Sequence, residues 1–206
     1  MLVSSAQSLT PSEAASVTGV PLKQVHRIID AGLMQGFVRK ERGSRLIALP
    51  ALIGLRLAYL TAAALTPATR QRILEKVLSD VTRTVVEEAP LMVDLQPVIR
   101  EVEAGLERLE RARQAVKSDP AIRGGEPVLI GTRVAVHDIA DMLDAGESAQ
   151  AVAAAYQHLT PDQIALASEY ATAYPRRGRP RAKPTWRAKP PKSSRTIKID
   201  DLPVVS

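Results

Sequence analysis

The 206-residue chain contains no cysteine, and only 3% of its residues are aromatic. Without thiols it can form neither a disulfide framework nor a thiolate metal site. Histidine is scarce as well, and no metal-ligand spacing surrounds any of the three. These are His26, His137 and His158, and we interpret all of them as polar surface positions. The composition therefore favours a protein without a metal centre.

A long uninterrupted apolar run is also lacking. Residues 46–65 carry a single charge, but that charge, Arg56, lies at the centre, and Pro50 and Gly54 interrupt the first half. A central arginine would cost a membrane span about 2.5–3.5 kcal/mol. We therefore expect the end of a strand followed by a buried, alanine-rich helix. Residues 1–9 lack the basic start and apolar core of a signal peptide, so we expect a cytoplasmic protein.

Signatures of catalysis are weak. Asp138, Asp141 and Asp144 recur every three residues on one predicted helix, and such steps drift around the helix surface, so they indicate a solvated acidic stripe. Gly124-Gly125 and Gly131 lack both the spacing and the lysine of a phosphate-binding loop. We expect neither an enzyme nor a cofactor.

Charge is present in quantity, and it is unevenly spread. Residues 1–57 carry seven basic and three acidic side chains, residues 58–175 eleven and seventeen, and residues 176–206 ten and two. Basic ends that flank an acidic middle predict a nucleic-acid contact at one or both ends. Residues 175–206 are rich in proline as well as in basic residues, which predicts a tail that is disordered alone and binds a partner.

Residues 1–57 show the pattern of a winged helix-turn-helix. The segment Thr10–Glu13 has the residues of a capping box, with proline at the first helical position. Gly19 can adopt the positive φ of the turn, and a second helix follows over about residues 21–31. The helical spacing predicts that four apolar residues of this helix face the core, namely Leu22, Val25, Ile28 and Ile29.

The opposite face of the second helix carries residue types that read base edges or bind phosphate. A hairpin with a glycine turn and basic residues follows as a wing, over about residues 37–47. The predicted DNA-binding residues are Pro21, Lys23, Gln24 and Arg27 on the helix and Arg39, Lys40, Arg42 and Arg45 on the wing. This arrangement resembles the N-terminal domain of MerR-like regulators. A solvated helix face is the alternative interpretation.

Residues 58–117 are predicted to be a helical linker or dimerisation region of a homodimer. One helix begins at Thr66-Pro67 and is expected to run toward Glu88. A strand is expected at residues 92–95, and a second helix over about residues 97–115. On that second helix, Glu107–Arg111 and Glu110–Arg113 have the spacing of favourable ion pairs.

Residues 118–174 are predicted to fold as a tight ribbon followed by three helices. The helices are expected at about residues 136–145, 148–156 and 160–173, the last with a full capping box. The third helix presents Asp162 and Glu169 and hardly a basic residue, so phosphate would be repelled. We expect a dimerisation or packing role for this unit. Together with the winged domain, it predicts a mainly α fold.

This third segment contains three specific sequence motifs. GGEPVLIGTRVAV at residues 124–136, AGES at 145–148 and LTPDQI at 159–164 closely resemble a small uncharacterised bacterial domain family, homeodomain-like in fold. That family occurs in antitoxins encoded beside PIN-type ribonuclease toxins, and the whole chain resembles a VapB-type antitoxin.

The resemblance implies a homodimer that binds an operator overlapping its own promoter, and a C-terminal tail that binds the toxin. PIN toxins cut RNA with a carboxylate-bound magnesium, and a basic, then amphipathic, tail is suited to blocking such a site. The predicted toxin-binding residues are Trp186, Arg187, Arg195, Ile197, Ile199, Asp200 and Leu202.

Two other functions stay open. A MerR-like regulator without a toxin would use the middle region to sense a ligand, although few aromatic residues are available for a ligand cage. A protein that coats RNA or DNA would use the tail as an electrostatic arm. Such an arm has no aromatic stacking platform apart from Trp186.

Overall fold

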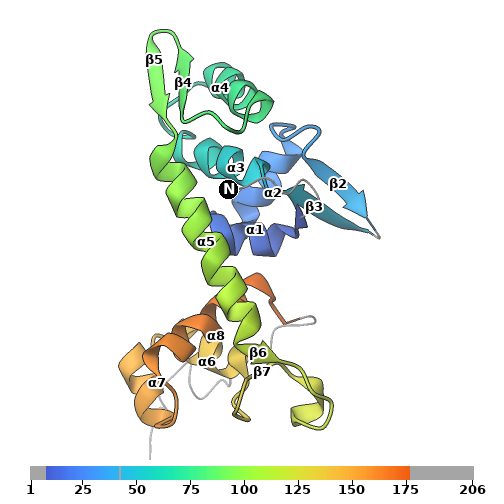
Figure 1. Cartoon of the computed structure of the whole chain (residues 1–206), viewed down its shortest axis with the longest axis vertical. Helices are drawn as coiled ribbons and strands as arrows, with labels where there is room; N and C mark the ends of the chain where they lie inside the picture. The colour runs from blue at the N-terminus through green and yellow to red at the C-terminus, as the bar shows by residue number, and fades with distance from the viewer. Residues whose placement is uncertain (1–7, 42, 177–206) are drawn as a thin grey trace, which may run out of the picture. The chain divides into compact units, whose positions relative to one another are not determined.

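The computed structural model describes residues 8–41 and 43–176 (Figure 1). The chain divides into two units, residues 1–175 and residues 176–206. Within the described residues the fold is mainly α-helical, with eight α-helices and seven short strands. None of these helices is both long and apolar enough to cross a membrane.

The predicted helix-turn-helix is present. Helix α1 (Pro11–Thr18) begins with a complete capping box between Thr10 and Glu13, and Gly19 ends it in the left-handed conformation, at φ 65°. Helix α2 (Leu22–Asp30) follows directly. The local signals predicted both helix ends because the capping side chains and the turn glycine lie within a few residues of the backbone groups that they satisfy.

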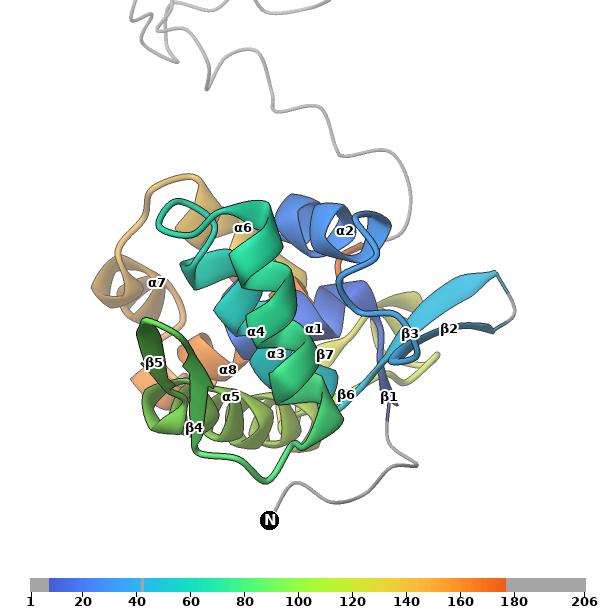
Figure 2. The same ribbon diagram turned by 90° about the horizontal axis from the view of Figure 1, so that it is seen from above.

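The wing is the hairpin of β2 (Val38–Glu41) and β3 (Ser44–Ala48). A short strand that the sequence pattern did not reveal, β1 (Ser8–Leu9), pairs with the other edge of β3. The three strands therefore form an antiparallel sheet in the order β1-β3-β2. In both Figure 1 and Figure 2 the β2–β3 hairpin projects away from the helices.

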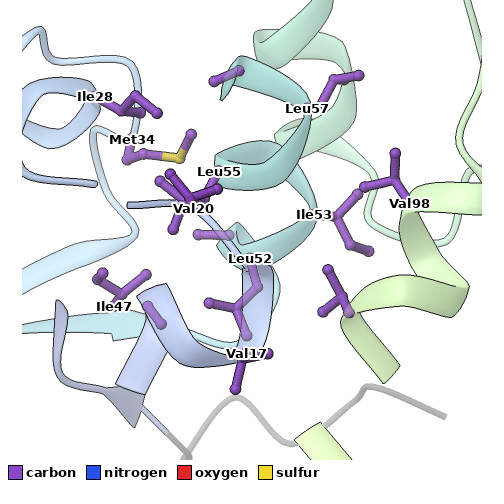
Figure 3. Packing of buried hydrophobic residues seen from close by; sticks show 14 of the residues in the cluster. Val17, Val20, Ile28, Met34, Ile47, Leu52, Ile53, Leu55, Leu57 and Val98 are labelled. Carbon is purple, nitrogen blue, oxygen red and sulfur yellow. The ribbon is translucent and has the colours of Figure 1, made fainter. Parts of the chain in front are cut away.

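The middle region contributes to the same core as the winged domain. Helix α3 (Ala51–Leu60) is the predicted buried helix, and it runs across the domain boundary that we predict at residues 57/58. Helix α5 (Gln96–Gln114) packs against both α3 and α1. Figure 3 shows Val17 of α1, Leu52 and Ile53 of α3 and Val98 of α5 within one apolar cluster.

The prediction for the helix that begins at Thr66 was wrong at its end. Helix α4 spans Pro67–Ser79 and does not continue toward Glu88. Glu88 instead ends strand β4 (Val85–Glu88), which forms a hairpin with the predicted strand, β5 (Leu91–Asp94). There Glu88 accepts hydrogen bonds from Arg72 (2.5 Å) and Lys76 (2.8 Å) of α4, so β4 is held against the helix that was expected to include it.

The third segment has its own core. Strands β6 (Val116–Lys117) and β7 (Val128–Leu129) form the ribbon, with a short 3-10 turn, η1 (Arg123–Gly125), between them. Helices α6 (Val136–Asp144), α7 (Ala149–Ala155) and α8 (Pro161–Ala173) follow, and the capping box predicted for the third is present at Thr160 and Gln163. The buried residues of this core are Leu129, Val134, Val136, Ile139, Val152, Leu159, Ile164 and Ala167.

The two cores are joined through α1, α5 and α8, which pack against one another. Gly105 of α5 makes the closest approach, because a Cβ atom at that position would collide with the backbone carbonyl of Val17 in α1. On the other side, Arg111 of α5 pairs with Asp162 of α8 at 2.8 Å. Arg111 therefore bonds across helices, whereas we expected it to pair with Glu107 on its own helix. The other expected pair, Glu110–Arg113, forms at 3.5 Å.

Candidate nucleic-acid interface

The face of α2 that carries the predicted DNA-binding residues is turned to the surface. Lys23 and Arg27 are exposed and Gln24 is half-buried, whereas Val25 and Ile28 on the other face are buried. Within the described part of the chain, neither of the two cations has an ion-pair partner. The helix therefore presents two positive charges on the side that faces away from its core.

The N-terminus of α2 is also open. Pro21, which precedes the helix, is exposed, and its side chain cannot cap the first backbone N–H groups. Uncapped N–H groups at a helix start, together with the positive end of the helix dipole, favour a bound phosphate. The site is in this respect typical of a helix whose first turn contacts nucleic acid.

One residue of α2 was assigned wrongly. Leu22 was predicted to face the core, but it is 38% exposed. Leu22 has the helical spacing of Val25 and Ile28, which predicted that it would be buried with them. It is, however, the first residue of α2, directly after the turn that follows α1, and its side chain there is partly exposed. Leu22 instead lines a hollow at the surface, described below.

The wing is tied to α2 by one ion pair. Arg45 of β3 contacts Asp30, the last residue of α2, at 2.7 Å. Arg39 of β2 pairs with Glu41 of the same strand at 3.5 Å, and Lys40 between them is exposed. The structure thus joins the wing to the last residue of α2, whereas Lys23 and Gln24 lie near the first residue of that helix. Arg42 lies outside the described residues.

Glu13 of α1 lies at the centre of a polar cluster that joins the winged domain to the end of α8. It accepts hydrogen bonds from the Tyr174 hydroxyl at 2.6 Å and from Arg113 of α5 at 2.9 Å. Arg113 also donates to the Tyr174 oxygen at 2.7 Å. The second carboxylate oxygen accepts from the backbone and hydroxyl of Thr10 at 2.7 and 2.9 Å. We call these four residues the Glu13 cluster.

Electrostatics in the Glu13 cluster favour the charged carboxylate. Burial alone would raise the pKa of Glu13, but the hydrogen bonds from Tyr174, the Thr10 backbone and Arg113 outweigh it, so the pKa lies below its ordinary value of 4.5. Burial and the bond to Glu13 raise the pKa of Tyr174 to about 12. At neutral pH Tyr174 is therefore a hydrogen-bond donor to an ionised carboxylate.

His137 supports the same end of α8. It is only 7% exposed, so its assignment as a surface residue was wrong. Its Nε2 atom lies 2.9 Å from the backbone oxygen of Tyr174, and because a carbonyl only accepts, the ring donates this hydrogen bond. Its Nδ1 atom is buried without a hydrogen-bond partner in the described structure. His137 therefore helps to fix Tyr174.

A surface hollow of about 290 Å³ separates α1, the start of α2 and α8. Pro21 and Leu22 line it from one side and Glu169 and Thr172 of α8 from the other. Glu169 accepts a hydrogen bond from Ser16 of α1 and lies 3.8 Å from Arg108 of α5. Glu169 and Asp162 of the third helix thus contact α1 and α5, and the last turn of α8 lies beside the N-terminal end of α2.

Within residues 8–41 and 43–176, no group of three or more His, Asp or Glu side chains could hold a metal ion. Asp138 of the acidic stripe pairs with Arg123 at 2.9 Å. The predicted toxin-binding residues, from Trp186 to Leu202, all lie outside the described residues.

Comparison with known proteins shows a family match for the third segment. Residues 116–171 match a family described as a protein of unknown function, DUF433. The whole chain is 37% identical over 191 residues to the uncharacterised protein y4eO of Sinorhizobium fredii, which covers 85% of this chain and 86% of that protein. The chain therefore belongs to the same family as y4eO and contains a DUF433 domain.

A crystal structure of Rv2018 from Mycobacterium tuberculosis aligns with 77% of this chain and 95% of that chain. The sequence identity is 21% and the TM-score 0.31, and a likeness of this size supports no functional argument.

Proposed function

We propose that the protein is the antitoxin of a type II toxin–antitoxin system. Its winged helix-turn-helix binds operator DNA and represses its own operon, and its C-terminal tail neutralises a PIN-type ribonuclease toxin. The observation that carries the DNA-binding half is the exposed pair Lys23 and Arg27 on a helix with an uncapped N-terminus, beside a basic wing. The antitoxin half rests on the resemblance of residues 118–174 to domains of VapB-type antitoxins and on the basic tail.

The charges around α2 support a DNA contact on its exposed side. Glu169, the acidic residue of α8 that lines the same hollow as Leu22, contacts Ser16 and Arg108, so its negative charge is partly compensated. Lys23 and Arg27 then dominate the open side of α2. Phosphate contacts from such cations fix the register of a protein on DNA, and Gln24 is of a type that reads adenine.

The DNA-binding half is tested with a duplex from the promoter region of the gene. The double variant Lys23→Ala/Arg27→Ala should bind this duplex about tenfold or more weakly, since one good contact contributes about 1–3 kcal/mol. Arg100→Ala/Arg133→Ala is the matched control, because it also removes two exposed positive charges from the described structure. Equal losses in both variants would show that α2 does not read DNA.

The antitoxin half is tested by co-purification with the protein encoded by the neighbouring gene. The full chain should retain this partner, and a chain that stops after Pro175 should not. If neither chain retains a partner while both bind promoter DNA, the alternative of a MerR-like regulator without a toxin is the correct one.

A further inference from the structure

Exposed large apolar side chains are concentrated in the middle region of the chain. Six such side chains are exposed among the described residues, and four of them lie between the end of α3 and the end of β5, namely Leu60, Val85, Leu91 and Met92. Met92 is the most exposed of them, at 71%. Single apolar residues at a surface are normal, whereas a group of them marks a surface that another molecule covers.

The β4–β5 hairpin has one covered face and one open face. Successive side chains of a strand point to opposite faces, and Met92 pairs with Glu87 in the register of the hairpin. Val86, one position before Glu87, is fully buried, and Glu88, one position after it, bonds to α4. Met92 therefore points away from the core, on the outer face that it shares with Val85.

The segment that joins α3 to α4 is also exposed, and it carries no charge. Residues 57–69 contain no Asp, Glu, Lys or Arg, although 24% of the whole chain is charged. Leu60 and the three alanines at residues 62–64 are exposed. Because binding to nucleic acid depends on cations that neutralise phosphates, this surface is not suited to DNA. It suits an apolar protein surface instead.

Arg72 of α4 links this segment to the hairpin. It donates hydrogen bonds to the Thr69 hydroxyl at 3.4 Å and to Glu88 at 2.5 Å. Leu91 is the cross-strand neighbour of Glu88, so the exposed end of the hairpin lies beside the N-terminal half of α4. In both Figure 1 and Figure 2 the hairpin lies on one side of α4 and the wing on the other. We call the exposed apolar residues of the segment and the hairpin the apolar patch, namely Leu60, residues 62–64, Leu91 and Met92.

We propose that the apolar patch is the contact surface of a homodimer, so that a second copy of this chain covers it. In a two-fold contact the same surface of both copies meets, and a charged patch would repel itself. The apolar patch contains no charge and avoids this repulsion. At its border Glu87 and Arg72 are exposed and opposite in sign, so each copy offers a charge that complements one on the other. The proposal goes beyond the proposed function and does not depend on it.

The composition of the apolar patch matches the centre of a protein interface. An interface of standard size buries about 800 Å² on each partner and takes about 20–30 residues from each. Its centre is apolar and enriched in methionine, and its rim is polar. Met92 and the leucines supply such a centre, and the polar residues of α4 and β4 supply a rim. In contrast, the described part of the DUF433 domain exposes a single large apolar side chain, Ile130.

The mass of the full chain in solution tests the proposal. In analytical ultracentrifugation at micromolar concentration, the wild type should have twice the 22.2 kDa mass of one chain. Met92→Arg should weaken the dimer by about tenfold or more, because it places a like charge from each copy at the centre of the contact. Since Met92 is exposed, the variant should keep the Tm of the wild type. Ile130→Arg is the matched control, an exposed apolar residue outside the apolar patch, and should stay dimeric.

Cross-linking is a second measurement that does not rely on a disruptive substitution. The chain contains no cysteine, so Met92→Cys introduces one thiol per chain. A short bismaleimide should join two copies of this variant into a covalent dimer. The same reagent should leave Ile130→Cys as single chains.

Three results would overturn the proposal. A monomeric wild type would leave the apolar patch to a different protein. A Met92→Arg chain that dimerises as tightly as the wild type would place the contact elsewhere, and a monomeric Ile130→Arg chain would place it in the DUF433 domain. None of these measurements includes DNA or a toxin, so their outcome is separate from success or failure of the proposed function.

Discussion

At the scale of single residues, Glu13 makes two kinds of contact, one with a neighbour in the sequence and one with residues far away in the sequence. Its carboxylate closes the capping box of α1 with Thr10, three residues away. The same carboxylate accepts hydrogen bonds from Arg113 and Tyr174, which are 100 and 161 residues away in the chain. The first role was predicted because capping is local. The second could not be predicted, because no pattern in the sequence relates such distant positions.

The Glu13 cluster predicts a dependence of stability on pH. The pKa of Glu13 is lower in the folded chain than its ordinary value of 4.5, so its contribution is complete above about pH 4.5 and is lost as the pH falls through the lowered value. Tyr174→Phe removes one donor and should bring the folded pKa closer to 4.5. Thermal unfolding followed from about pH 3 to pH 7 should then show a smaller difference in Tm between acid and neutral solution.

Tyr170→Phe is the matched control for this variant, since Tyr170 contacts the Tyr174 ring at 4.6 Å between centroids but has no place in the Glu13 cluster. If the two phenylalanine variants showed the same pH profile, the hydroxyl of Tyr174 would not be the group that matters.

At the scale of elements, the helices were predictable and several of their contacts were not. Capping residues predicted the starts of α1, α4, α7 and α8, because each cap bonds to a backbone group only a few residues away. The strand β4 escaped detection because four residues, two of them acidic, carry too short a pattern. Of the DNA-binding candidates, the structure shows that Lys23 and Arg27 are exposed, and their contact with DNA stays a prediction.

The close packing of α1 and α5 leads to a prediction for Gly105→Ala. Alanine is favoured over glycine by about 1 kcal/mol within a helix, so propensity alone would raise the stability. The added methyl group would collide with the Val17 carbonyl, which is backbone and cannot rotate away. We expect a net loss of about 1–3 kcal/mol, the usual cost of overpacking.

The measurement is chemical or thermal unfolding of the variant beside Arg100→Ala, a substitution on the exposed face of the same helix. A stability equal to or above that of the wild type would mean that α1 and α5 can separate at little cost.

At the scale of the whole molecule, the two hydrophobic cores are bridged by polar and close contacts rather than by a flexible linker. Arg111–Asp162, Ser16–Glu169 and the Glu13 cluster all connect elements of one core to α8 of the other. Residues 1–175 accordingly form a single compact unit. We predict one cooperative unfolding transition for this unit, in which loss of the winged domain and loss of the DUF433 domain coincide.

Calorimetry tests this prediction, because the calorimetric and van't Hoff enthalpies of unfolding agree for a single transition. Two resolved transitions would contradict it and would show that the contacts at Asp162, Glu169 and Tyr174 add little to the coupling of the two cores.

The position of Tyr174 has a mechanical consequence. A pulling force applied to the chain after Pro175 reaches Tyr174 before it reaches any buried residue of the two cores. There the load is shared between the His137 bond to the backbone and the bonds of Glu13 and Arg113 to the hydroxyl, which belong to three different helices. Unfolding that starts from this end must therefore break contacts to α6, α1 and α5 before α8 can detach from the fold.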